Sequence, residues 1–161
     1  MNLKTEFYIT AIRKRTDSKT LLDDISLLRE FKLVKNSPLF WRADPFLLSL
    51  KENDYLFVEI GNKITGKGSL AFARIDDGKV KYGFKRCSSE KFHMSFPNVF
   101  AQDGKIFMIP ETKRDNCLAL YRCDNLNEGF EKTKVLISDV NVVDSTFYKN
   151  YILCYSNSSD L

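Results

Sequence analysis

The sequence predicts an all-β fold of the β-propeller type, and three observations lead to this prediction. Aromatic residues make up 13% of the 161 residues and occur in short bursts between polar turns, which is typical of strands. A strand, turn and strand motif recurs at intervals of about 50 residues. Further strand-like segments follow the first two copies, so these repeats have the four-stranded antiparallel form of a propeller blade.

The first repeat is expected over residues 38–87. Its opening strand starts at Asp44, a polar turn follows at 51–54, and a second strand ends at Glu59. A third strand is expected at 69–74 and a fourth at 80–84. The Asp-Gly pair at 77–78 indicates a tight hairpin between them, because glycine accepts the positive φ of primed turns.

The second repeat is expected over residues 92–138 and the third from 141 to 161. The second opens at Phe96 and its second strand ends at Glu111, so the interval equals that from 44 to 59. The third opens at Asp144 and reaches only its second strand, at 151–155. We therefore expect only the first two to three blades of a ring, either as a fragment or with a second chain completing it, since open sheet edges promote aggregation.

The N-terminal stretch is less regular. Residues 6–13 predict a strand, which in propellers can complete the last blade, and residues 19–31 predict either a short helix or a packed loop.

Composition and charge narrow the function classes. A net charge of +4, from 25 basic and 21 acidic residues mixed along the chain, does not predict nucleic-acid binding. The sequence has neither the apolar region of a signal peptide nor a run long enough to span a membrane, so we expect a cytoplasmic protein. The four cysteines lack metal-ligand spacing and predict buried or half-buried free thiols in a reducing compartment. No metal site and no cofactor are expected.

Five short motifs resemble a known family. They are Trp41 to Leu48, Lys67 to Ile75, His93 to Pro97, Phe107 to Thr112 and Val143 to Thr146. Together they resemble the propeller domain at the N-terminus of glucosamine inositolphosphorylceramide transferases and of bacterial proteins, some of them fused to formyltransferase-like or glycosyltransferase domains. The resemblance runs from about Glu6 to Leu161. It implies a five-bladed propeller of the superfamily that includes family 43 glycoside hydrolases, with the site at the mouth of the central channel.

The same resemblance implies three candidate catalytic residues. Asp44, in an Ala-Asp-Pro motif, matches the general base of those hydrolases, and Asp144 matches the inner-strand aspartate that tunes it. Glu111 is the nearest candidate for the general acid, although its Pro-Glu-Thr context departs from the hydrolase pattern. Inverting hydrolysis requires two carboxyl groups roughly 6.5–9.5 Å apart. The alternatives are aspartates that bond backbone amides, and a glutamate that serves the architecture because Glu59 recurs at its repeat position.

Three further residues are candidates for binding substrate. His93 stands at the entrance of the second repeat, where an imidazole can bond a sugar hydroxyl, or can be structural. Trp41 and Arg42 precede the first motif and are candidates for a sugar-stacking platform, the alternative for Trp41 being a place in the core.

The sequence thus predicts a carbohydrate-binding or carbohydrate-modifying propeller associated with glycan or glycoconjugate biosynthesis. The expected partners are a carbohydrate or glycoconjugate and a fused or separate transferase domain. The alternatives are an inverting glycoside hydrolase and a non-catalytic scaffold for protein contacts. Whether the chain is an enzyme stays open at this stage.

Overall fold

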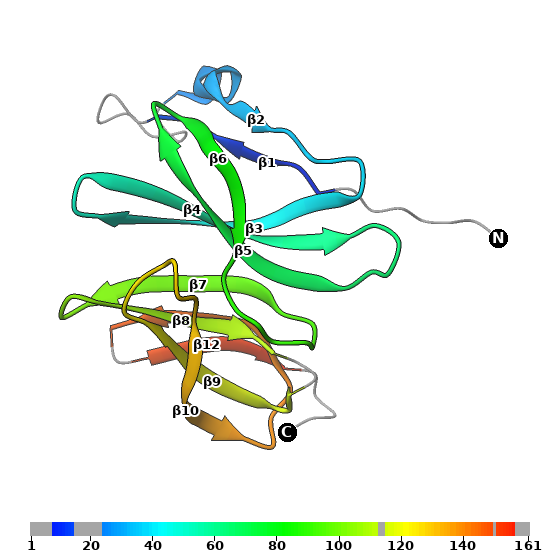
Figure 1. Cartoon of the computed structure of the whole chain (residues 1–161), viewed down its shortest axis with the longest axis vertical. Helices are drawn as coiled ribbons and strands as arrows, with labels where there is room; N and C mark the ends of the chain where they lie inside the picture. The colour runs from blue at the N-terminus through cyan, green and yellow to red at the C-terminus, as the bar shows by residue number, and fades with distance from the viewer. Residues whose placement is uncertain (1–7, 15–23, 113–114, 150, 157–161) are drawn as a thin grey trace.

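The computed structural model describes residues 8–14, 24–112, 115–149 and 151–156, and in them the chain is all-β. Two four-stranded antiparallel sheets form most of it (Figure 1). The first sheet contains β3 (Phe40–Leu50), β4 (Asn53–Asn62), β5 (Gly68–Asp76) and β6 (Lys79–Arg86). The second contains β7 (Ser95–Gln102), β8 (Lys105–Glu111), β9 (Cys117–Cys123) and β10 (Glu131–Ser138). Each sheet pairs its strands in chain order, and the predicted strands within them are confirmed.

Two smaller sheets complete the described structure. β1 (Thr10–Ile12) pairs with β2 (Lys32–Val34), and β11 (Val142–Tyr148) pairs with β12 (Tyr151–Ser156). A 3-10 helix, η1 (Ile25–Glu30), lies between β1 and β2 and is capped by the carboxylate of Asp24. This confirms the helical alternative for the second half of 19–31. Residues 6–7 and 19–23 lie outside the described residues.

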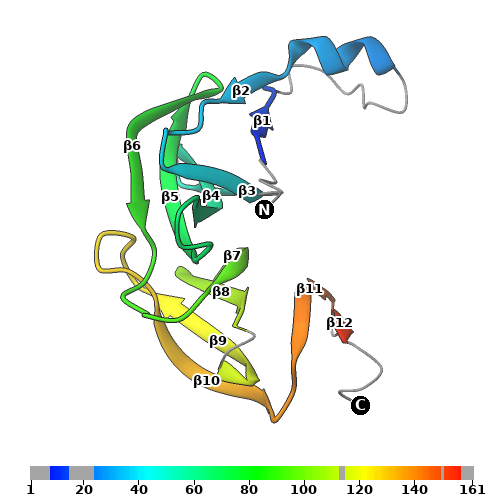
Figure 2. The same ribbon diagram turned by 90° about the vertical axis from the view of Figure 1, so that its right-hand side faces the viewer.

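The first strand of each of the three later sheets lies on the inner side of a curved arrangement. Figure 2 shows β3, β7 and β11 on the concave side, and β6 and β10 on the convex side. Residues at the start of these three strands, although far apart in the sequence, therefore face a common region.

The main core lies between the two four-stranded sheets. Phe57 of β4 is fully buried, and its ring stacks on Phe72 at 5.6 Å and meets the edge of Phe130 at 6.1 Å. Met108 and Tyr121 supply the facing layer from the second sheet. Burial of such large side chains contributes roughly 1.5–3 kcal/mol each, so this layer holds the two sheets against one another.

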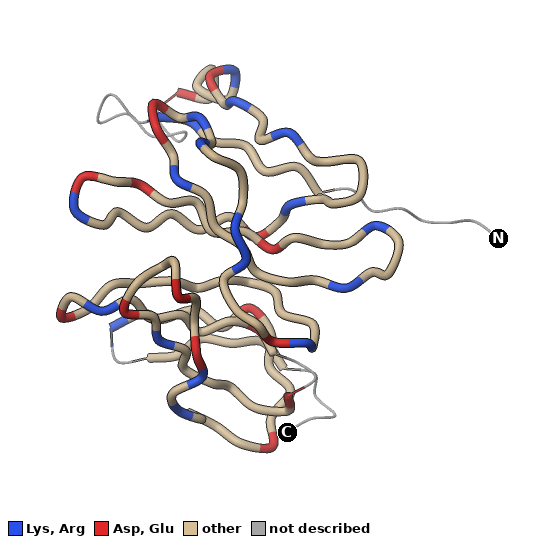
Figure 3. The backbone as a smooth tube through the Cα atoms, in the orientation of Figure 1, with Lys and Arg blue, Asp and Glu red and all other residues tan. Residues whose placement is uncertain are grey.

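The hairpin turns have the predicted geometry. Asp77 and Gly78 have φ values of 48° and 68°, and Asp103 and Gly104 have 51° and 73°. Two successive positive φ values define the primed turn that matches the twist of antiparallel strands. Lys, Arg, Asp and Glu are spread over hairpin tips and outer strands (Figure 3).

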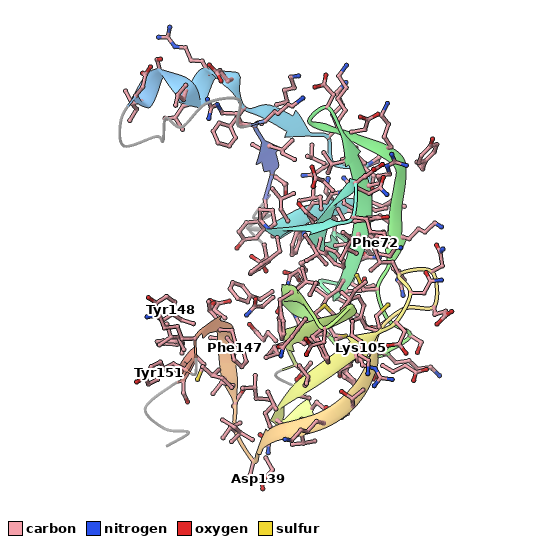
Figure 4. All side chains as sticks on the ribbon, turned by 90° about the vertical axis from the view of Figure 1, so that its left-hand side faces the viewer. Phe72, Lys105, Asp139, Phe147, Tyr148 and Tyr151 are labelled. Carbon is pink, nitrogen blue, oxygen red and sulfur yellow. The ribbon has the colours of Figure 1, made fainter. Side chains whose placement is uncertain are left out.

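The β11–β12 hairpin packs only in part against the second sheet. Phe147 points toward that sheet, with its ring centroid 5.8 Å from Phe100, whereas Tyr148 and Tyr151 point away from it (Figure 4). A groove of about 670 Å³ separates the hairpin from the sheet and is lined mostly by apolar side chains.

All four cysteines are free thiols, as predicted. Cys87 and Cys123 are buried and Cys117 is half-buried. The exposed Cys154 departs from the prediction, because β12 has no strand on its outer edge among the described residues.

Candidate functional site

The three inner strands share one backbone irregularity. Asp44, Phe96 and Asp144 have φ values of 48°, 48° and 52°, and the pairing register shifts at each of them. Residues other than glycine adopt this left-handed backbone conformation at a cost of roughly 1–2 kcal/mol. Its recurrence, together with the register shifts, marks a β-bulge in each repeat. Phenylalanine in the second repeat shows that the bulge does not itself require a carboxylate.

The bulges set which residues face them from the second strands. The residue before each bulge, at 43, 95 and 143, pairs with Glu59, Glu111 and Tyr155 respectively. Asp44 and Glu59 therefore come from the first four-stranded sheet, Glu111 from the second, and Asp144 from the β11–β12 sheet. We call Asp44, Glu59, Glu111 and Asp144 the carboxyl cluster.

Glu59 is the most buried member of the carboxyl cluster, with 5% of its surface exposed. Burial first, and then the neighbouring Asp44 carboxylate, raise the pKa of Glu59 to about 8. Glu59 is therefore mostly protonated at neutral pH and donates a hydrogen bond to Asp44. The Oδ2 atom of Asp44 also accepts the backbone N–H of Phe96 at 3.3 Å, which links the first sheet to the second.

His93 and Gly68 form the wall beside Glu59. The backbone N–H of Gly68 donates to Nδ1 of His93 at 2.9 Å, so a neutral imidazole carries its proton on Nε2. That Nε2 lies 3.7 Å from Oε1 of Glu59. A Cβ atom at Gly68 would lie 2.1 Å from Oε1 of Glu59 and 2.8 Å from Cε1 of His93. Only glycine leaves room for this arrangement.

Glu111 occupies the equivalent position but has different neighbours. It is half-buried, and burial followed by the Asp144 carboxylate raises its pKa. The Asp144 backbone N–H and the Ser95 hydroxyl donate hydrogen bonds to the Glu111 carboxylate. These bonds favour the ionised form and so lower the pKa, which opposes the effect of burial. Nearby, the Asn98 side chain donates to the carbonyl of Ser145 at 2.9 Å and ties β7 to β11.

The structure thus brings together Asp44, His93, Glu111 and Asp144 among the predicted site residues. Arg42 lies elsewhere: its guanidinium stacks over the Phe84 ring at 4.6 Å and donates to the carbonyl of Lys35. Trp41 packs on Gly61, where an added Cβ would lie 1.9 Å from the indole ring, and against Tyr8.

Sequence reasoning did not select Glu59 or Gly68 for the site. The recurrence of glutamate at 59 and 111 favours an architectural role for Glu59, and Gly68 is only one residue of the motif from Lys67 to Ile75. The available signal was the glycine at the start of a buried strand, where it makes room for a neighbouring side chain.

Within the described ranges, no group of three or more His, Cys, Asp or Glu residues is arranged to hold a metal ion. No helix in the same part of the chain has the length and apolar character needed to cross a membrane.

Residues 32–161 match the family model described as glucosamine inositolphosphorylceramide transferase 1, N-terminal. The chain belongs to this family. The match includes the whole carboxyl cluster, His93 and Gly68, so the site lies within the part of the chain that this transferase N-terminal family shares.

Curated relatives carry the same family name. A protein of Arabidopsis thaliana named glucosamine inositolphosphorylceramide transferase 1 is 36% identical over 110 residues, which cover 68% of this chain and 14% of that protein. Proteins of the same name from Oryza sativa subsp. indica and subsp. japonica are each 32% identical over 119 residues, or 73% of this chain and 16% of theirs. The chain therefore matches a small part of much longer transferases. No solved structure matches it.

Proposed function

We propose that this chain forms blades of a five-bladed β-propeller that binds the sugar of a glycoconjugate and serves glycosyl transfer. The repeats are 38–87, 92–138 and 141–161, the last being incomplete. The observation that carries the proposal is the convergence of four carboxyl groups and His93 from three successive sheets. Asp44 and Asp144 lie on the inner strands β3 and β11, Glu59 and Glu111 on the second strands β4 and β8, and His93 just before β7.

The arrangement of the sheets supports the propeller. Each four-stranded sheet is a meander, its first strand lies on the concave side, and the same bulge recurs on β3, β7 and β11 (Figure 2). Hydrogen bonds from inner-strand amides to carboxylates of the preceding sheet join neighbouring units, at Phe96 to Asp44 and at Asp144 to Glu111. The blade count of five comes from the family resemblance.

The carboxyl cluster suits an amino sugar. Asp144 is exposed and Glu111 half-buried, so both offer oxygens to sugar hydroxyls, whereas the proton of buried Glu59 is already donated to Asp44. Burial and, after it, repulsion among the carboxylates raise the pKa of Glu59 and Glu111, and a ligand ammonium group would offset that repulsion. The relatives' name includes glucosamine, which carries such a group. Arg42 lies outside this binding arrangement, whereas Trp41 packs on Gly61, the register partner of Gly68.

A glycoside hydrolase is the second candidate function, because a carboxyl group that keeps its proton near neutral pH is suited to general acid catalysis. The geometry limits how it would work. Asp44 and Glu59 are hydrogen-bonded to each other, so no attacking water fits between them. An inverting pair, roughly 6.5–9.5 Å apart, would have to combine residues from different sheets. For this reason we place binding ahead of hydrolysis.

Titration calorimetry with glucosamine, glucose and N-acetylglucosamine tests the binding proposal. We expect saturable binding that is tightest for glucosamine, and about tenfold weaker binding in Asp144→Asn, since a lost charged hydrogen bond costs roughly 1.5–3 kcal/mol. Asp103→Asn is the matched control, because Asp103 has a similar φ of 51° but lies in a distant hairpin turn.

Absence of saturable sugar binding, or equal weakening by both variants, would contradict a sugar site and favour a non-catalytic scaffold for a transferase. Release of free sugar from a glycoside, abolished in Glu59→Gln, would instead establish hydrolysis.

A further inference from the structure

A second pocket lies away from the carboxyl cluster, between the two-stranded β1–β2 sheet and β6. Its volume is about 370 Å³. Four basic side chains line it, namely Lys32, Lys35, Arg42 and Lys79, and its lining contains no Asp or Glu. The remaining wall is apolar, and it includes Val34, Val80 and Phe84.

Arg42 lines this pocket and forms no ion pair with any of the described residues. The guanidinium stacks on the Phe84 ring and donates through Nη1 to the carbonyl of Lys35 at 2.6 Å. Its Nε is buried and has no acceptor among the described residues, and burial lowers the pKa of Arg42. A partly desolvated cation without a carboxylate partner is unfavourable until an anion joins it.

Lys32, Lys35 and Lys79 add to the positive charge of the pocket. Within the described ranges none of them forms an ion pair, whereas the neighbouring carboxylates are already engaged: Asp77 with Lys14 at 3.1 Å and Asp76 with Lys81 at 3.4 Å. The exposed Asp77 carboxylate also attracts Lys32 and Lys79, whereas Lys35 and Arg42 form no ion pair within the described residues, so the positive charge of the pocket is offset only in part.

We propose that this pocket binds a phosphate group. Ammonium groups attract phosphate as point charges, and a guanidinium held flat by an aromatic ring presents its donors in a fixed plane, which suits tetrahedral oxyanions. The apolar wall leaves room for an organic group attached to the phosphate. The site does not rest on the proposed sugar binding, since it shares no residue with the carboxyl cluster.

Titration calorimetry of the folded chain with inorganic phosphate and pyrophosphate, at constant ionic strength, tests this proposal. We expect one saturable site, weakened at least about tenfold in Lys35→Gln/Lys79→Gln, because charge-assisted hydrogen bonds contribute roughly 1.5–3 kcal/mol each. The matched control is Lys85→Gln/Lys105→Gln, which removes the same charge outside the pocket and should leave binding within about twofold. Arg42→Lys keeps the charge but loses the planar donors, so it should weaken binding while the melting temperature stays close to that of the wild type.

The source of the phosphate is distinguished with vesicles of phosphatidylcholine, with and without phosphatidylinositol. Vesicle binding that requires phosphatidylinositol and is lost in Lys35→Gln/Lys79→Gln identifies a lipid headgroup. Phosphate binding without vesicle binding identifies a soluble phosphate compound. No saturable binding of either anion, or equal weakening in the two double variants, would overturn the proposal and leave sugar binding at Asp144 unaffected.

Discussion

Glu59 and Glu111 occupy the same place in successive repeats, yet their chemistry differs. Both pair with the residue before a bulge. Glu59 is nearly fully buried and hydrogen-bonded to another carboxyl group, whereas Glu111 is half-buried and accepts hydrogen bonds from Ser95 and Asp144. The repeat sets the position of each side chain, but the neighbours decide whether it holds a proton. This difference is open to four tests.

The largest expected effect is on the pH dependence of stability. The pKa of Glu59 rises from an ordinary 4.5 to about 8 on folding, so between these values the folded chain binds the extra proton. The free energy of unfolding therefore falls as pH rises from about 4.5 to 8, by up to several kcal/mol at about 1.4 kcal/mol per pKa unit. Glu59→Gln removes this dependence, so its stability relative to the wild type should increase across that range in urea unfolding.

Glu111→Gln is the matched comparison for that experiment. Relative to the wild type, the unfolding free energy of Glu111→Gln should increase less with pH than that of Glu59→Gln. The reason is that the hydrogen bonds from Asp144 and Ser95 favour the ionised Glu111 carboxylate. Parallel pH profiles for Glu59→Gln and the wild type would show that Glu59 is ionised in the folded protein.

Gly68→Ala should have the next largest effect. Its Cβ would overlap Oε1 of Glu59 and press on the His93 ring, so we expect a loss of about 1–3 kcal/mol in unfolding free energy and an altered pKa of Glu59. Gly104→Ala is the control, because Gly104 has a φ of 73° but no atom within 4 Å of an added Cβ. It should lose stability through backbone strain alone and leave the pKa of Glu59 unchanged.

Asp44→Asn should change the proton affinity of Glu59 more than it changes stability. Asparagine tolerates the left-handed conformation and keeps an oxygen for the Phe96 N–H, while the charge that repels ionised Glu59 is lost. We expect the pKa of Glu59 to fall by about one unit in a carboxyl carbon NMR titration. Asp144→Asn should lower the pKa of Glu111 instead, and a larger shift at Glu59 than at Glu111 would contradict the arrangement described here.

Phe96→Asn should have the smallest effect. The substitution relieves a left-handed conformation that is costly for phenylalanine, by roughly 1–2 kcal/mol, but loses the edge-on contact with Phe46 at a centroid distance of 5.0 Å. Since aromatic pairs contribute about 0.5–1.5 kcal/mol, the two effects nearly cancel. A loss above about 3 kcal/mol in urea unfolding would mean that the ring, rather than the bulge, organises β7.

The sequence by itself determined the all-β class, the strands, their spacing and the Asp-Gly turns. These features are local, because an alternating pattern and a residue that accepts positive φ act within a few positions. The recurrence of Asp44, Phe96 and Asp144 at the repeat starts is also a feature of the sequence itself, and all three are bulge positions.

The tertiary structure alone decided which of these residues interact. Glu59 keeps its proton because it is buried and lies beside the Asp44 carboxylate of the neighbouring strand. Gly68 matters only because it lies against Glu59 and His93. Arg42, two residues from Asp44 in the chain, lies in another pocket, because Phe84 and Lys35 hold its guanidinium there. Proton affinity and ligand contacts depend on charge and burial summed over distant segments, which no local pattern encodes.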